Sequence, residues 1–122
     1  MMKLFGMALS VKALLIYDLD SFQLAIDSQG KITALQDKNS TADYLLPDKN
    51  SYLLSLKSDS SILTPIKATF SDNNHTILFD FNQDLHVTVA AIVKKKHISF
   101  EVVSISNDNQ VDAVIWGPYF TT

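Results

Sequence analysis

The feature that most constrains this chain is a two-residue alternation of apolar and polar side chains. It is clearest over residues 85–94, where every second residue is apolar: Leu85, Val87, Val89, Ala91 and Val93. Successive side chains of a β-strand point to opposite faces of a sheet, so this pattern predicts a strand with one buried face. The same period recurs through most of the chain, and beyond residue 12 no helical period competes with it. We therefore expect an all-β fold.

Short polar turns separate the alternating segments. Gly30 and the S-D-N-N-H run at residues 71–75 mark two of them, because such residues favour tight turns. The expected strands lie at residues 22–27, 31–36, 51–57, 62–70, 76–81, 85–94, 97–106 and 111–116, preceded by a strand-like stretch at 13–17. About seven or eight strands with hairpin and meander connections predict an antiparallel β-sandwich, alone or within a larger supersandwich.

Two residues mark irregularities within these strands. Pro65 has no backbone N–H to donate, which confines the first half of the 62–70 segment to a sheet edge or a bend. In the 97–106 segment the apolar phase shifts after Val102 to Val103 and Ile105. Such a shift predicts a β-bulge, since one extra residue moves the following side chains to the other face.

The composition excludes several classes of function. All ten basic residues are lysines and none is arginine, while the net charge is −3. Arginine makes the bidentate contacts typical of phosphate and guanine recognition, so the sequence argues against nucleic-acid binding. The chain has no cysteine, which excludes disulfides, thiolate catalysis and cysteine-bound metals. A membrane-spanning helix needs roughly twenty consecutive apolar residues, and the sequence contains no such run.

The two ends of the chain differ in character from its middle. Residues 1–12 place Lys3 before a short apolar run, which resembles a degenerate signal segment, and we expect the β-sandwich domain to occupy residues 13–122. Near the other end, Trp116, Tyr119 and Phe120 crowd three aromatic side chains together. A free end is normally polar. We expect this aromatic end either to dock on a core or to belong to a domain that is incomplete at its C-terminus.

Side chains that could perform catalysis are spread along the chain. The histidines His75, His86 and His97 have no spacing typical of metal ligands, and Asp80 and Glu101 lie on neighbouring predicted strands as solvent-facing acids. The three glycines cannot build a phosphate-binding loop. We therefore predict no catalytic residue, no metal site and no cofactor.

The aromatic residues are the best candidates for ligand contact. Trp116, Tyr119 and Tyr52 could stack on sugar rings, because a pyranose presents an apolar face to an aromatic plane. The alternative is that Trp116 belongs to the core, since it ends a strand in phase with Val114. Both interpretations remain open from the sequence.

One segment resembles a known family. Residues 22–38, FQLAIDSQGKITALQDK, contain a strand, a D-x-x-G turn, an I-x-x-L strand and a D-K pair. This succession resembles the opening of the galactose-mutarotase-like β-sandwich that precedes the catalytic domain in carbohydrate-active enzymes such as glycoside hydrolases. The similarity continues through the later strands to W-G-P at residues 116–118. It covers about residues 20–120, in a chain shorter than such domains usually are.

The resemblance implies a non-catalytic module outside the cytoplasm, periplasmic or secreted, in a protein that degrades polysaccharides. Such a module supports a catalytic domain or contacts glycans weakly, and it contributes no catalytic residue of its own. The alternative function is a free-standing ligand-binding or assembly domain. In that case a second copy would pack on the sheet through exposed strand edges, and the chain would form oligomers.

Overall fold

The described part of the computed structural model is an all-β fold. It comprises residues 14–40, 43–46, 49–71, 73, 75–82 and 84–119, and the expected signal-like segment 1–12 lies outside these residues. Eleven strands, β2 to β12, form three antiparallel sheets among the described residues. The sequence prediction of an antiparallel β-sandwich is confirmed, with more and shorter strands than expected.

The first sheet is built from consecutive hairpins, in the order β2-β3-β4-β5. Its strands are β2 (Leu14–Asp18), β3 (Phe22–Asp27), β4 (Lys31–Asp37) and β5 (Ser51–Tyr52). The β3–β4 turn is fastened by the Asp27 carboxylate, which accepts hydrogen bonds from the backbone N–H groups of Gln29 (2.9 Å) and Lys31 (3.0 Å). Gly30 completes this turn at a φ of 83°, in the left-handed region that glycine adopts readily.

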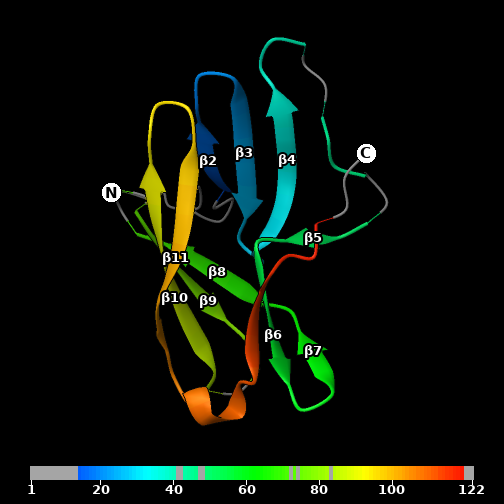
Figure 1. Cartoon of the computed structure of the whole chain (residues 1–122), viewed down its shortest axis with the longest axis vertical. Helices are drawn as coiled ribbons and strands as arrows, with labels where there is room; N and C mark the ends of the chain where they lie inside the picture. The colour runs from blue at the N-terminus through cyan, green and yellow to red at the C-terminus, as the bar shows by residue number, and fades with distance from the viewer. Residues whose placement is uncertain are drawn as a thin grey trace, which may run out of the picture.

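The second sheet is a four-stranded meander with the order β11-β10-β9-β8. Its strands are β8 (Lys67–Phe70), β9 (Thr76–Asp80), β10 (His86–Val93) and β11 (Ile98–Ile105). The third sheet has the order β12-β6-β7, with β6 (Leu54–Ser58), β7 (Ser61–Leu63) and β12 (Ala113–Trp116). Only Leu53 separates β5 from β6, so an almost continuous segment joins the first and third sheets, as Figure 1 shows.

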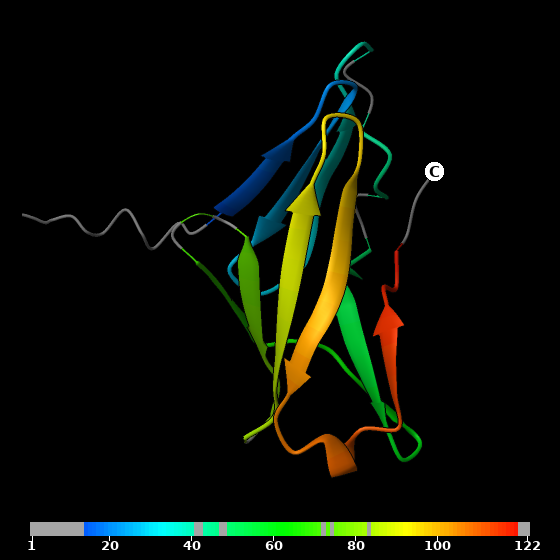
Figure 2. The same cartoon turned by 60° about the vertical axis from the view of Figure 1, so that its left-hand side comes forward.

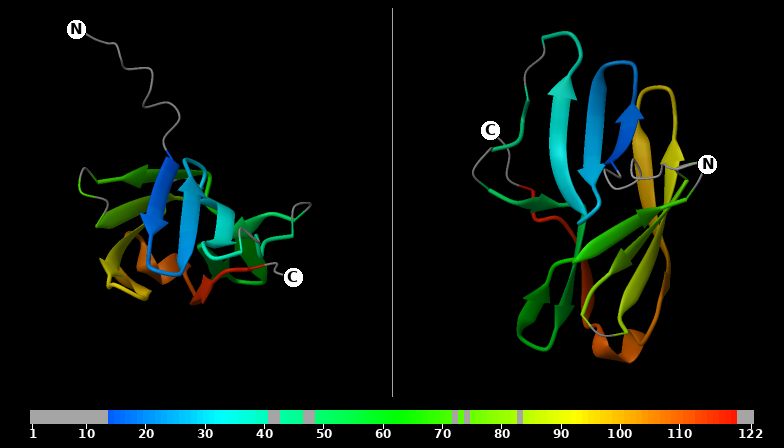
Figure 3. Two further views of the ribbon diagram at one scale, coloured as in Figure 1. Left: turned by 90° about the horizontal axis from the view of Figure 1, so that it is seen from above. Right: turned by 180° about the vertical axis from the view of Figure 1, so that it is seen from behind.

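The three sheets enclose one hydrophobic core. Each contributes fully buried side chains, among them Ile26 from β3, Leu56 from β6 and Phe79 from β9. The second sheet contacts both of the others, since Phe100 on β11 touches Tyr17 on β2 and Trp116 on β12. Figures 2 and 3 show the molecule from the side, from above and from behind, with the β2–β3 turn and the β6–β7 hairpin at opposite ends of the long axis.

The structure confirms the predicted bulge and shows where the extra residue lies. Val89 pairs with Val102 while Thr88 pairs with Ser104, so Val103 has no partner on β10. The bulge leaves Val103 60% exposed. The change of phase therefore turns this apolar side chain outward instead of into the core.

Two expected strands are each divided in two. The predicted strand 62–70 separates at Pro65 into β7, an edge strand of the third sheet, and β8, an edge strand of the second. The missing N–H of Pro65 explains the break, and the edge position predicted for the first half is confirmed. The predicted strand 51–57 is interrupted at Leu53, where β5 leaves the first sheet and β6 enters the third.

Candidate functional site

Trp116 lies at an open edge of the sandwich. It pairs with Leu54 across the β12–β6 ladder, and Val114 pairs with Leu56 in the same register. Residues directly opposite each other share a face, so Trp116 is on the face that carries the buried Leu54 and Leu56. Its side chain is nevertheless 41% exposed. The reason is that β12 is the outermost strand of its sheet, so no strand covers it on the far side.

An aromatic series connects Trp116 to the interior. Its ring lies 6.4 Å from that of Phe100, centroid to centroid, at an interplanar angle of 34°. Phe100 in turn meets the buried Tyr17 edge-on, at 5.9 Å and 74°. The contact between Tyr17 and Phe100 has the edge-to-face geometry that aromatic pairs favour, whereas the rings of Phe100 and Trp116 are tilted relative to each other. The half-exposed indole is thus held by packing on one side and open to solvent on the other.

Tyr119 and Tyr52 are held near the same β5–β6 junction. The Tyr119 hydroxyl donates a hydrogen bond of 3.0 Å to the Leu53 carbonyl, and the Tyr52 backbone N–H donates one of 3.1 Å to the Pro118 carbonyl. Tyr119 is 47% exposed, and partial burial raises its pKa. These hydrogen bonds join residues 52–53 to residues 118–119, which are more than 60 positions away in sequence. Trp116, which pairs with Leu54, lies beside this junction.

Ser55 fastens this junction from within. Its buried hydroxyl donates a hydrogen bond of 2.6 Å to the Gly117 carbonyl. Because Gly117 directly follows Trp116, this bond fixes the backbone that carries the indole. The three aromatic residues could be singled out from the sequence by their residue type. The burial of Ser55 could not be predicted, because nothing in the sequence distinguishes it from a serine in a turn.

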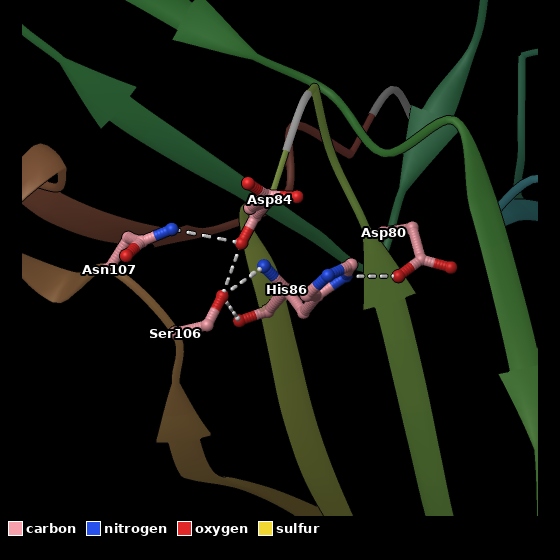
Figure 4. Close-up of polar contacts among 5 residues, drawn as sticks. All are labelled: Asp80, Asp84, His86, Ser106 and Asn107. Atoms are coloured by element: carbon pink, nitrogen blue, oxygen red, sulfur yellow. Dashed lines mark hydrogen bonds and ion pairs between the residues drawn. The ribbon is translucent and has the colours of Figure 1, made fainter.

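A polar cluster lies where β9, β10 and the end of β11 meet (Figure 4). The imidazole Nδ1 of His86 contacts the carboxylate of Asp80, its direct partner across the β9–β10 ladder. Ser106 Oγ accepts a hydrogen bond of 2.8 Å from the His86 backbone N–H and donates one of 2.7 Å to the Asp84 carbonyl. Asn107 Nδ2 also donates to that carbonyl, at 3.1 Å.

This cluster contains the residue types of a catalytic triad in a different arrangement. A nucleophilic serine needs its hydroxyl on the imidazole of the base. Here Ser106 binds the main chain of His86, while the ring points away from it toward Asp80 (Figure 4). The cluster therefore fastens the β9–β10 turn to the end of β11.

The other acids and histidines remain apart. Asp80 and Glu101 are not on neighbouring strands as expected, because β10 lies between β9 and β11. His75 and His97 are exposed. Within the described residues, no three histidine or acidic side chains gather closely enough to hold a metal ion. In the same part of the chain, no helix has the length and apolar character needed to cross a membrane.

The surface is hollowed at two places beside the segment 43–46. The first hollow has a volume of about 480 Å³ and is lined by Ser21, Phe22, Leu35, Asp37, Asn39 and Tyr44. We call it the Tyr44 hollow. The second, of about 610 Å³, lies across the same segment and is lined by Lys31, Ile32, Thr33, Asp43, Leu45, Leu46, Lys49, Asn50 and Ser51. The sequence analysis predicted no strand between residues 36 and 51 and gave no indication of either hollow.

Comparison of the chain with protein-family models, with curated proteins and with solved structures finds no match.

Proposed function

We propose that this chain is a non-catalytic β-sandwich module of a carbohydrate-active protein, which contacts glycans through Trp116 and Tyr119. The observation that carries the proposal is the setting of Trp116. Its indole is 41% exposed, yet it rests on Phe100 and belongs to a paired strand. A fixed and exposed aromatic plane suits the apolar face of a sugar ring, because little conformational freedom is lost on binding.

The resemblance of residues 22–38 to the opening of galactose-mutarotase-like domains supports the same proposal. The resemblance implies a module that accompanies a catalytic domain, outside the cytoplasm, in a protein that acts on polysaccharides. Tyr119 would extend the contact surface, since its ring is half-exposed while its hydroxyl is anchored on Leu53. Tyr52, which bonds to Pro118 through its backbone, would flank this surface.

The chain carries its own reporter for this proposal, because Trp116 is its only tryptophan. We expect the fluorescence of the purified chain to change on titration with the glycans that bind on a glycan array. In isothermal titration calorimetry, which needs no tryptophan signal, Trp116→Ala should weaken binding about tenfold or more, which corresponds to about 1.4 kcal/mol, and Trp116→Phe should retain part of the affinity. Ile92→Ala, an exposed apolar site on β10, is the matched control. Unchanged affinity in Trp116→Ala, or an array without binding, contradicts the proposal.

The second candidate function is self-association through a sheet edge. It is favoured by β7, an edge strand of the third sheet on which Ile62 is 53% exposed. An uncovered edge with an apolar side chain is a surface on which a second copy can pair. Light scattering should then report a dimer or larger oligomer that Ile62→Lys converts to a monomer. A monomer at all concentrations excludes this candidate.

A further inference from the structure

We propose that the Tyr44 hollow binds one neutral sugar unit, and this inference rests on the proposed function for the class of its ligand. The hollow lies on the first sheet, whereas Trp116 lies on the third. It would therefore be a second, separate contact. Its volume of about 480 Å³ falls within the roughly 300–1,000 Å³ of pockets that bind small molecules.

The floor of the hollow is an extension of the hydrophobic core. Phe22 pairs with Asp37 and Leu24 pairs with Leu35, so all four side chains share one face of the β3–β4 hairpin. Leu24 is buried, while Phe22 and Leu35 are half-buried and pack against the core from its margin. The apolar face thus continues into the hollow without a covering strand.

Tyr44 forms a wall whose position is fixed by hydrogen bonds. Its backbone N–H donates to the Leu35 carbonyl at 2.9 Å, and its hydroxyl donates to Asp37 Oδ2 at 3.3 Å. The Asp43 carboxylate supports the same segment by accepting a bond of 3.3 Å from the Leu35 N–H. With Tyr44 41% exposed, an aromatic surface stands beside the apolar floor.

Asp37 supplies charge at the rim of the hollow. Its carboxylate accepts hydrogen bonds from the Asn39 backbone N–H (2.9 Å), the Ser40 hydroxyl (3.0 Å) and Tyr44. These bonds, that of Asn39 first, lower the pKa of Asp37, so the group is ionised at neutral pH. The Ser21 hydroxyl and the Asn39 amide add groups that can both donate and accept.

This combination disfavours an anionic ligand and suits a neutral hydroxyl-rich ring. None of the six lining residues is basic, and Asp37 would repel an anion. The neighbouring Lys38 is held by Asp18 at 2.7 Å and by the Leu19 carbonyl at 2.7 Å. A sugar ring can place its C–H face on Tyr44 and Phe22 and its hydroxyls toward Asp37, Asn39 and Ser21.

The test is titration of the labelled full chain with the methyl glycosides of glucose, galactose and mannose, followed by backbone amide NMR. We expect at least one glycoside to shift the amide signals of Phe22, Asp37 and Tyr44. Tyr44→Ala should weaken this binding roughly tenfold, whereas Tyr44→Phe keeps the ring and should lose roughly threefold or less. Ile92→Ala is again the control. Because Tyr44 is exposed, both variants should keep the amide spectrum of the folded chain.

Other outcomes separate this inference from the proposed function. Shifts confined to the surroundings of Trp116 and insensitive to Tyr44→Ala overturn the hollow as a site and leave the proposed function standing. Shifts at the hollow without any response of Trp116 support the hollow and contradict the aromatic surface. Choline chloride and sodium glucuronate serve as cationic and anionic probes. Tighter binding of either at the hollow, or no shift with any glycoside, overturns the assignment to a neutral sugar.

Discussion

Gly30 is the position where the smallest substitution should have the largest structural consequence. It closes the β3–β4 turn at a φ of 83° and faces the second sheet. A Cβ atom at Gly30 would lie 2.8 Å from Cγ of Pro65 and 3.3 Å from Cδ1 of Phe79. Phe79 is fully buried and Pro65 is a rigid ring, so neither neighbour can move away easily.

Gly30→Ala should destabilise the fold in two independent ways, by backbone strain and by overpacking. An alanine in the left-handed region costs about 1–2 kcal/mol. Forcing an extra carbon into a packed region costs about 1–3 kcal/mol more. The free energy of unfolding should therefore fall by about 2–5 kcal/mol, a large part of the roughly 5–15 kcal/mol typical of a domain. Pro65→Ala removes Cγ of Pro65, the atom closest to the added Cβ. Introducing Gly30→Ala into the Pro65→Ala variant should therefore lower the free energy of unfolding by only about 1–3 kcal/mol, most of it from the backbone.

Urea denaturation followed by Trp116 fluorescence measures these free energies. Gln29→Ala, an exposed side chain in the same turn, is the control, and it should stay within about 0.5 kcal/mol of the parent. A cost below about 0.5 kcal/mol for Gly30→Ala would refute both parts of the reasoning. An equal cost with and without Pro65 would refute the packing part alone and leave the backbone part intact.

Three further predictions concern the core, the C-terminal junction and the pH dependence of stability. Phe79→Ala should cost about 3–5 kcal/mol in urea denaturation because Phe79 is fully buried; a cost under about 1 kcal/mol contradicts its place in the core. Ser55→Ala should cost about 1–3 kcal/mol by leaving the Gly117 carbonyl without its donor, and equal stability of this variant contradicts that bond. Burial raises the pKa of Tyr17 from 10.0 to about 12, so the native state holds the phenol proton more tightly than the unfolded chain. The contribution of Tyr17 to the free energy of unfolding should be fully present below pH 10 and should be lost between pH 10 and 12, by at most about 2.7 kcal/mol. The free energy of unfolding of Tyr17→Phe should fall less over that range.

The parts of the fold that the sequence predicts well are those in which one strand face is buried. In the expected strand 76–81, Ile77, Phe79 and Phe81 occupy every second position, and all three are at most 1% exposed. The alternation also placed the bulge near Val103, because an extra residue shifts the apolar phase in a way that the sequence records. These features depend on local periodicity, which a single chain displays directly.

The features that the sequence could not predict depend on which strands become neighbours. Alternation puts Trp116 in phase with Val114, yet the exposure of Trp116 follows from the place of β12 at the edge of a sheet. Tyr44 lies in a polar stretch without periodicity, and hydrogen bonds to Leu35 and Asp37 hold it over the hairpin. Leu53 gave no sign that it separates two sheets, since a buried leucine suits a continuous strand equally well.

The edge position of Trp116 explains how one residue can be both held and accessible. At the centre of a sheet, neighbouring strands and the opposite layer would bury the indole, as they bury Phe79. On a loop the indole would be exposed but would lose conformational freedom on binding a ligand. On β12 the ladder to β6 fixes its backbone, Phe100 supports one side of the ring, and the other side remains open. Tyr44 reaches the same compromise through hydrogen bonds at the margin of the first sheet. Both proposed contacts thus lie where the sandwich leaves part of its apolar face uncovered. The fold already fixes the side chains there, so a ligand can bind with little loss of conformational freedom.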